Sequence, residues 1–377
     1  MDEPLERRAV ISGAAQSDIG RRLHRSGLDL TIEAALRAID DAGLTVDDID
    51  GLSTYPGSGG PFGGASGAEL HDALRLSLNW RDGGLETSGQ LGAVHKAVLA
   101  VGAGLARHVL VFRTVVEGSG GPVRASAAGG GMPPAFRYLI PYGAASAANW
   151  VACYANRHMH DYGTTREQLG AVAINARNHA ASNPKAIYTE PMTMEDYLEA
   201  RLVSEPFGLY DCDVPCDGST AVVVSHRDHA GDAPEVPIQV NALGTAHRGR
   251  PSWDQFDDLT TMGMRDSAAS LWERTELTPE DVDTAQLYDG FSWLTLAWIE
   301  AMGFCQRGEG GPFVEDGTRI AHGGALPLNT WGGQLSGGRL HGFGFLHEAV
   351  MQLRGQAHLQ VEDAEVAVVG VGGGPEC

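Results

Sequence analysis

The sequence predicts an α/β protein whose two halves are built alike, with helices packed on sheets. The first observation is a repeated order of elements: a helix, a Leu-Thr turn, an acidic stretch and a strand occur near residue 44 and again near residue 277. The second observation is that each copy continues with a Ser/Gly-rich turn, a helix and a β-branched strand. With 377 residues and 51 glycines, the chain is long enough to bury a large core and rich in tight turns.

The first copy begins with a predicted helix over residues 31–44, in which apolar side chains recur at helical spacing. An acidic turn at 45–50 leads to a strand at Gly51 and Leu52. The turn Thr87-Ser88-Gly89 then opens a predicted helix over 90–105, and a β-branched strand follows at 109–112. This order gives the first half an alternation of helices and strands.

The second copy repeats these elements in the same order. Its predicted helix, turn and strand lie at 266–274, 277–283 and 286–288, and its Ser/Gly-rich turn, helix and strand lie at 336–338, 345–354 and 366–369. Four elements matched in order indicate a duplication rather than a chance likeness of one short segment.

A long region separates the two copies. Residues 118–134 are rich in Gly, Ala and Ser and predict a loop, whereas 149–181 and 194–201 predict helices. Proline-rich residues 234–237 mark a boundary. We therefore divide the chain into an N-terminal half, 1–234, which includes an inserted loop region at 118–210, and a C-terminal half, 235–377.

Charge and cysteine content narrow the function classes. A net charge of −21 argues against unspecific binding to nucleic acid or to an anionic membrane. The first eight residues lack an apolar signal segment, no apolar run reaches the length of a membrane span, and five cysteines do not pair evenly. These features predict a soluble cytoplasmic protein. Cys212 and Cys216 have no second ligand pair at zinc-site spacing, so we predict no metal.

Several motifs, taken in order, resemble the thiolase superfamily over essentially the whole chain. They are Asp211-Cys212-Asp213-Val214-Pro215-Cys216-Asp217-Gly218-Ser219, Tyr288-Asp289-Gly290-Phe291, Asn329-Thr330-Trp331-Gly332-Gly333, Gln352-Leu353-Arg354-Gly355 and Gly370-Val371-Gly372-Gly373-Gly374. The likeness is greatest to the sterol-carrier-protein-x and lipid-transfer-protein branch. The resemblance implies a thiolase-like duplicated fold, with two βαβαβαββ-type halves layered α-β-α-β-α.

The sequence departs from that family at the residues that carry thiolysis. Glu86 stands where the resemblance places the nucleophilic cysteine, and Tyr288 replaces the catalytic histidine. Residues 338–342 replace the Gly-His-Pro loop, and the second cysteine falls on Gly370. A carboxylate does not replace a thiolate as an acyl carrier, so covalent acyl transfer is not expected.

The chemistry that remains is carbon–carbon cleavage without an acyl-enzyme. The sequence looks like the aldolases of steroid side-chain degradation, which cleave a 17-hydroxy-steroid carboxyl-CoA to a 17-ketosteroid and propionyl-CoA by a retro-aldol reaction. The resemblance implies no cofactor beyond the CoA of the substrate. Two alternatives stay open: a non-catalytic subunit that binds acyl-CoA or lipid, and a divergent thiolase-like acyltransferase. Titratable residues at the altered positions favour an enzyme, because a pocket without chemistry has no need of them.

We predict four catalytic candidates, each with a plainer alternative. Tyr288 is the first candidate for proton transfer, or else a buried core tyrosine. Asp289 is a further acid/base candidate, or else a cap for a helix that begins near Phe291. His341 is an acid/base group or an ordinary loop histidine, and Glu86 is a base or a charge at a helix end.

Five residues are predicted to bind the substrate or its CoA. Arg339 is a partner for a phosphate or an enolate, and Arg248 and Arg250 are partners for CoA phosphates or, alternatively, a solvated basic turn. Asn329 and Gly373, from the matching motifs, complete the set.

The resemblance also implies partners. Thiolase-like proteins form homodimers through their N-terminal halves, and the steroid aldolases work with a small zinc-ribbon/OB-fold protein. This sequence has no segment of that kind, so such a partner would act in trans. The predicted ligand is an acyl-CoA, with no nucleic acid and no membrane.

We expect no acyl-enzyme to form, because glutamate and glycine occupy positions 86 and 370. The intact mass of the protein should be unchanged after incubation with acetoacetyl-CoA. A stable acyl adduct, or thiolysis at ordinary thiolase rates, would contradict this expectation.

Overall fold

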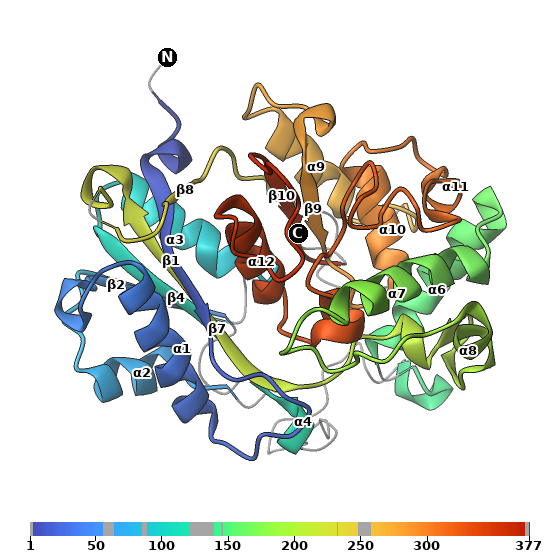
Figure 1. The fold of residues 1–377 in the computed structure, drawn as a ribbon, viewed down its shortest axis with the longest axis horizontal. Coiled ribbons are helices and arrows are strands. Elements are labelled where there is room, and N and C mark those ends of the chain that lie inside the picture. The colour runs from blue at the N-terminus through green and yellow to red at the C-terminus, as the bar shows by residue number, and fades with distance from the viewer. Residues whose placement is uncertain are drawn as a thin grey trace.

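The computed structural model describes residues 3–55, 64–84, 89–120, 139–144, 146–231, 233–247, 258–373 and 377. Within them, a large mixed sheet and a small parallel sheet are packed on helices (Figure 1). The predicted α/β class is therefore confirmed.

The large sheet belongs to the first half, with the strand order β3-β2-β4-β7-β1-β8. The bounds are β1 Ala9–Gln16, β2 Gly51–Thr54, β3 Trp80–Gly83, β4 His108–Val116, β7 Asp217–His226 and β8 Ile238–Gln239. β2 runs parallel to β3 and β4, whereas β7 runs antiparallel to β4 and β1. Nearly every residue of β4 and β7 is buried, as expected for central strands covered on both faces.

Helices cover both faces of this sheet. Leu110 and Phe112 of β4 pack in one apolar cluster with α1 (Gly27–Asp41) and α2 (Gly67–Leu74). Val109 and Val111, which alternate with them, pack in the other cluster with α3 (Gly92–Gly102). α12 (Phe343–Leu353) contacts the sheet as well as β9 and β10, and lies between them in Figure 1.

α1 illustrates how local signals set the ends of a helix. It begins at Gly27 rather than at the predicted residue 31, because the Ser26 hydroxyl accepts a hydrogen bond from the Asp29 N–H at 3.1 Å. Leu30 and Ala34 on its inner face are fully buried. The helix ends at Asp41, just before Gly43, whose φ of 69° favours glycine.

The second half contains a parallel pair of strands, β9 (Thr284–Leu287) and β10 (Ala367–Gly370). Around them lie α9 (Met264–Trp272), α10 (Ser292–Ala301), α11 (Gly310–Val314) and α12. The predicted repeat is visible at matched turns: Thr45 and Thr278 each form a capping box with an aspartate three residues on, and a strand follows each turn. The duplicated order of elements is thus confirmed for these pieces.

The two halves differ in the size of their sheets. Among the described residues, β9 and β10 form a two-stranded sheet, beside the six strands of the first sheet. β8 follows the predicted boundary at 234 yet pairs with β1 of the first half. The division of the chain at residue 234 stays a prediction.

The inserted region is largely helical. It contains α4 (Glu117–Gly120), α6 (Ala147–Tyr162), α7 (Arg166–Ala180) and α8 (Met194–Glu199), followed by strands β5 (Leu202–Ser204) and β6 (Phe207–Gly208). The helix predicted over 149–181 is divided in two, because Gly163 has a φ of 76° and Thr165 caps the next helix. Most of the loop predicted at 118–134 lies outside the described residues.

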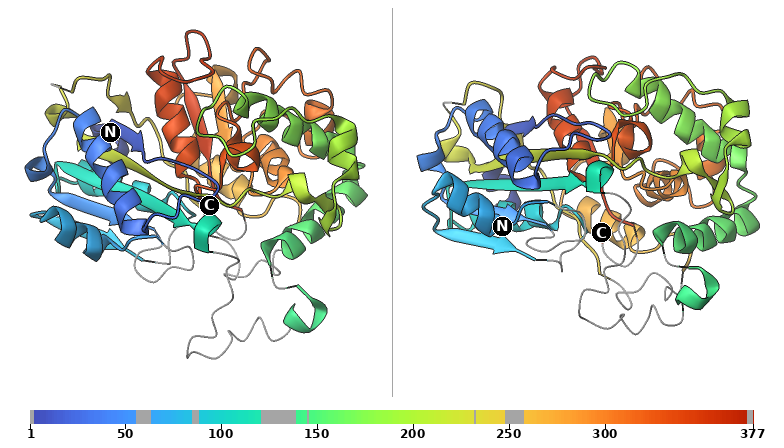
Figure 2. Two further views of the ribbon diagram at one scale, coloured as in Figure 1. Left: turned by 60° about the horizontal axis from the view of Figure 1, so that its bottom comes forward. Right: turned by 90° about the horizontal axis from the view of Figure 1, so that it is seen from below.

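Short turns connect these elements, and one of them matters for the site. Single 3-10 turns lie at Leu5–Arg8, Val46–Asp48, Ile140–Tyr142, Leu209–Asp211, Arg227–His229 and Pro279–Asp281. Gly333–Gly337 forms a π-helical turn before α12. Figure 2 shows α4 at the end of β4, between the first sheet and the helices of the second half.

The two halves are joined by buried polar contacts. The fully buried Arg354 side chain of the second half pairs with Asp41 at 2.7 Å and donates to the carbonyl of Ser12 at 2.9 Å. Trp293 and Trp298 are buried in the core rather than exposed at a surface. No described helix is both long and apolar enough to cross a membrane.

Candidate active site

The candidate site is built where β9 ends. Tyr288 follows this strand, and its N–H donates to the carbonyl of Gly370 at 2.8 Å. Asn329 accepts from the N–H of Leu287 at 2.7 Å and donates to its carbonyl at 2.8 Å. Because both amide atoms of Asn329 hold the strand, this residue positions Tyr288, and its predicted role in binding the substrate stays a prediction.

Tyr288 is packed tightly and is 8% exposed. Its ring lies against Gly290, where a Cβ atom would come within 2.6 Å of ring carbon Cε1. On another side it contacts Phe345, with 6.0 Å between ring centroids. Burial raises the pKa of Tyr288 above its ordinary value, and the negative charge of Asp213 adds to the rise. Tyr288 is therefore a protonated phenol at neutral pH.

Asp289 does not cap the helix that follows it, so that alternative is wrong. α10 begins at Ser292, and its N-cap residue Phe291 has no side-chain cap. The Asp289 carboxyl group points instead to the π-helical turn, where it accepts from the N–H of Gln334 at 2.7 Å. A Cβ atom on Gly333 would lie 1.8 Å from Asp289 Oδ2, so this contact requires glycine. The motif spacing could not reveal a partner 45 residues away.

Arg339 lies between two buried carboxylates. Its Nε donates to Glu117 Oε2 at 2.7 Å, and its Nη1 donates to Asp213 Oδ1 at 3.2 Å. The side chains of Glu117 and Asp213 are 3% and 9% exposed, against 25% for Arg339. Ionised carboxylates at this depth need a partner, and Arg339 supplies it for both. Arg339 therefore makes a structural charge contact, and its predicted role as a partner for a phosphate or an enolate stays a prediction.

His341 completes this cluster. Its Nδ1 lies 3.3 Å from Nη2 of Arg113, and its Nε2 lies 3.7 Å from Oε1 of Glu117. Because a guanidinium only donates, Nδ1 is the acceptor and the proton of neutral His341 is assigned to Nε2, facing Glu117. His341 has a φ of 49°, a strained conformation for a side chain of this size. Strain at a buried polar cluster points to a functional site.

The environments of these groups separate their pKa values. Burial, helped by the charge of Arg113, lowers the pKa of His341 to about 4. Burial raises the pKa of Asp213 to about 7, against the effect of Arg339, and raises that of Asp289 to about 8. Burial acts to raise the pKa of Glu117, but the contact with His341 and the charge of Arg339 outweigh it, so this carboxylate stays ionised. The site thus combines a neutral imidazole, a neutral phenol and carboxyls that titrate near neutrality.

The position predicted for the second thiolase cysteine is closely packed. A Cβ atom on Gly370 would lie 2.9 Å from Trp298 and 3.0 Å from Leu287, tighter than ordinary contact. Gly373 packs on Leu294 in the same way, at 3.0 Å, so its role in binding CoA stays a prediction. Glu86, Arg248 and Arg250 lie outside the described residues.

Comparison with known proteins decides the family. The chain is 35% identical to a steroid side-chain-cleaving aldolase of Thermomonospora curvata, over 97% of this chain and 95% of that protein. It is 36% identical to the 17-hydroxy-3-oxo-4-pregnene-20-carboxyl-CoA lyase of Mycobacterium tuberculosis, over 98% and 97% of the two chains. Residues 244–376 match the family model described as thiolase C-terminal domain-like.

The chain belongs to the thiolase superfamily, in its lipid-transfer-protein branch. A solved structure, an Ltp2-ChsH2(DUF35) aldolase, has a TM-score of 0.87 and 34% identity, with 99% of this chain and 97% of that one covered. Human mitochondrial 3-ketoacyl-CoA thiolase has a TM-score of 0.65 at 14% identity, over 98% and 97% of the two chains, and shows the shared fold alone. The thiolase-like fold expected from the motifs is confirmed.

Sequence reasoning does not find three members of this thiolase-superfamily site. Arg113 and Glu117 follow one another along the end of β4, and Asp213 lies in a stretch that has the composition of an acidic turn. One usable signal is that Arg113 and Glu117 interrupt or end a β-branched strand, where buried charges need partners. In the described part of the chain, no group of three or more acidic, histidine or cysteine side chains is arranged to hold a metal ion.

The raised pKa of Asp289 predicts a pH-dependent stability. With a folded-state pKa of about 8, Asp289 keeps its proton up to about that pH. An aspartate in the unfolded chain, with a pKa of about 3.9, loses its proton at much lower pH. This contribution to stability is full at low pH and is lost as pH rises through that window. Asp289→Asn, which keeps an acceptor for Gln334, should therefore lose less stability than the wild type between about pH 5 and pH 8 in urea unfolding.

The exposed Asp316 offers a matched control. Its hydrogen bond with Thr318 lowers its pKa, so it is ionised in both states across this window, and Asp316→Asn should keep the wild-type slope. Equal slopes for wild type and Asp289→Asn would show that Asp289 is ionised in the folded protein.

Proposed function

We propose that this chain is a carbon–carbon lyase that cleaves a β-hydroxyacyl-CoA by a retro-aldol reaction without an acyl-enzyme. The observation that supports this proposal most strongly is the setting of Tyr288. Its buried phenol is protonated and lies beside the cluster of Glu117, Arg339 and Asp213. The relatives named as a steroid side-chain-cleaving aldolase and a carboxyl-CoA lyase support the reaction type and a steroid side-chain substrate. The products would be a ketone such as a 17-ketosteroid and propionyl-CoA, with no cofactor beyond the CoA of the substrate.

Tyr288 acts in this scheme as the acid. A phenol that serves as a base needs a lowered pKa, and burial here has the opposite effect. When the Cα–Cβ bond breaks, its electron pair passes to the thioester as an enolate, and a proton must reach Cα. A neutral phenol is suited to donate that proton or a hydrogen bond to the enolate. The positive charge of Arg339, whose side chain is 25% exposed, favours the same intermediate.

Asp213 is the proposed base among the described residues. The β-hydroxyl proton must go to a group that is free to accept it near neutral pH. The Nδ1 lone pair of His341 faces Arg113, and a pKa of about 4 makes this imidazole a weak base. Asp213, with a pKa of about 7, is poised to take and return a proton. His341 is then a positioning residue that shares Glu117 with Arg339.

The alternative functions fit the site less well. A subunit that only binds lipid gains nothing from two buried carboxylates and the buried Arg113, which are costly to desolvate. An acyltransferase needs a nucleophile that carries the acyl group, and Glu86 stands where the resemblance places the nucleophilic cysteine. The lyase uses each of the buried groups.

We further propose that the chain works as a homodimer that recruits a small zinc-ribbon/OB-fold subunit in trans. The similar solved structure is named as a complex of an aldolase with a ChsH2(DUF35) chain, which supports a separate partner. Among the described residues, β3 lies at the edge of the large sheet with β2 on one side, and such an edge is suited to pairing with a second copy.

Sedimentation should therefore give a multiple of 39.8 kDa for the chain alone. Arg81→Pro, in the middle of β3, removes a backbone N–H donor from that edge and should yield monomers. Arg81→Lys is the matched control and should remain a dimer. A wild-type monomer at micromolar concentration, with a native circular dichroism spectrum, would contradict the assembly.

Tyr288→Phe tests the acid directly. The change removes one oxygen and keeps the ring that packs on Phe345, so unfolding free energy should fall by about 1 kcal/mol or less. Release of propionyl-CoA should fall by about 100-fold or more, the usual effect of a positioned acid. The assay follows a β-hydroxyacyl-CoA with a bulky ketone-forming end, with and without the small partner.

Tyr162→Phe, at the end of α6, is the control and should retain wild-type turnover. If the wild type is active and Tyr288→Phe keeps its rate, Tyr288 does not transfer the proton.

A further inference from the structure

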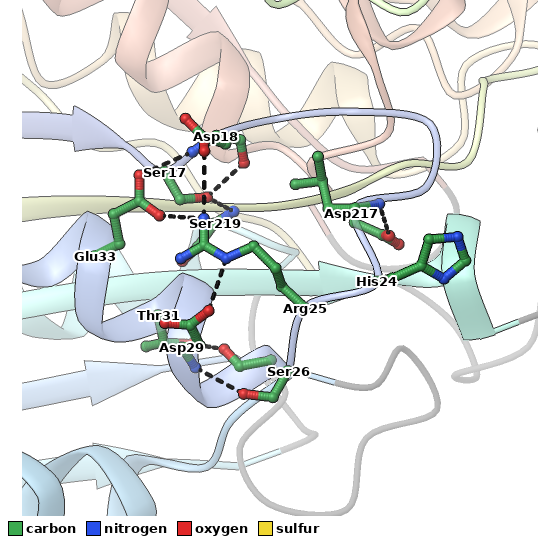
Figure 3. Close-up of polar contacts among 12 residues, drawn as sticks. Ser17, Asp18, His24, Arg25, Ser26, Asp29, Thr31, Glu33, Asp217 and Ser219 are labelled. Carbon is green, nitrogen blue, oxygen red and sulfur yellow. Dashed lines mark hydrogen bonds and ion pairs between the residues drawn. The ribbon is translucent and has the colours of Figure 1, made fainter.

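Asp217, at the first position of β7, joins three separate segments through one buried carboxylate. Its Oδ2 accepts from the N–H of Leu23 at 2.8 Å, and its Oδ1 accepts from the N–H of Ser119 at 3.0 Å. The Ser119 hydroxyl also donates to Asp217, and the same hydroxyl accepts from the N–H of His24 at 2.9 Å. The side chain is fully buried. One aspartate thus connects β7, α4 and the segment after β1. Figure 3 labels Asp217 of β7 and His24 of that segment, which lie near each other.

The segment after β1, residues 17–26, packs closely on α4. A Cβ atom on Gly118 would lie 1.7 Å from the carbonyl oxygen of Arg21, so the two backbones touch and only glycine fits. Gly20 and Asp217 exchange backbone hydrogen bonds at 3.1 and 2.9 Å. Arg21 donates to the carbonyl of Pro215 at 2.8 Å. The position of α4 is therefore fixed from one side by this segment and from the other by Asp217.

α4 carries Glu117, but this helix has little stability of its own. It is a single helical turn of four residues, too short to be stable alone. The N–H groups of Glu117 and Gly118 donate to the carbonyl of Cys216 at 3.1 and 3.3 Å, next to Asp217. The carboxylate of Glu117 reaches Arg339 at 2.7 Å from this turn. Any shift of α4 would move Glu117 against Arg339 and His341.

We propose that Asp217 is a positioning residue for the reaction, which holds α4 so that the Glu117 carboxylate meets Arg339 and His341. The inference rests on the proposed lyase function for its kinetic consequence, whereas the hydrogen bonds themselves do not depend on the reaction. Asp217 would not touch the substrate. It acts through Ser119 and the backbone of α4.

The kinetic test uses Asp217→Asn in the full-length protein with its partner. An amide cannot accept from all three donors, so α4 should loosen, and kcat should fall by about 10- to 100-fold because reacting groups tolerate little displacement. KM should change little, because the substrate-contacting groups remain. Adding Asp217→Asn to Glu117→Gln should not lower kcat further, since both changes disrupt the same ion pair.

Asp29→Asn is the matched control. This change breaks the exposed ion pair between Asp29 and Arg25 in the same region, which is drawn in Figure 3. The Asp29 side chain contacts neither α4 nor β7. Wild-type kcat is expected for this variant. Full additivity of Asp217→Asn with Glu117→Gln, or equal kcat in Asp217→Asn and wild type, would overturn the proposal.

A crystal structure of Asp217→Asn separates this inference from the proposed function. Glu117 should move away from Arg339, so that the ion pair, 2.7 Å long in the wild type, is broken or the carboxylate is disordered. If that ion pair persists unchanged in the variant, the positioning role is wrong, whether or not the wild type has lyase activity. If wild type proves inactive but Glu117 moves, the lyase proposal fails and the positioning role stands.

Discussion

The site depends on the ion pairs that Arg339 makes with Glu117 and Asp213. Glu117 comes from the start of α4, Asp213 from the segment before β7 and Arg339 from the turn before α12, so this one guanidinium joins both halves of the chain. Removing Arg339 would leave the buried Glu117 carboxylate without its compensating cation, which costs about 3–5 kcal/mol. Such a contact fixes the distance between the halves, and it thereby fixes the place of Tyr288 and His341 between them.

The duplicated fold explains why these groups meet. The two halves pack their sheets on opposite sides of α12, which lies between the large sheet and the β9–β10 pair. The backbone of Tyr288 is held by Asn329 and Gly370 from the second half, whereas Asp217 and α4 bring Glu117 from the first. His341 of the second half, with a left-handed backbone conformation, contacts Arg113 and Glu117 of the first half. The site therefore exists only where the halves are packed together.

The fold could be predicted further than the site. Periodicity and turn residues locate α1, α3, α9 and α12 to within a few positions, because helix faces and caps are local signals. Tyr288 and His341 are identified through motif positions, and they lie in one cluster. The cap role suggested for Asp289 is wrong because its partner, Gln334, is distant in sequence. Glu117 and Arg113 could not be predicted for the same reason, because ion pairs between distant segments leave no periodic pattern in the sequence.

The separation of pKa values explains how a thiolase fold can work without its cysteine. Acyl transfer needs a nucleophile that holds the acyl group, whereas a retro-aldol step needs only a proton acceptor, a proton donor and a stabilised enolate. Burial keeps the Tyr288 phenol protonated, brings the pKa of Asp213 to about 7 and leaves His341 neutral with a pKa of about 4. Groups whose environments push their pKa values apart divide the roles of acid and base among themselves. In the proposed mechanism, the same burial that makes the cluster costly therefore sets the proton-transfer roles of its members.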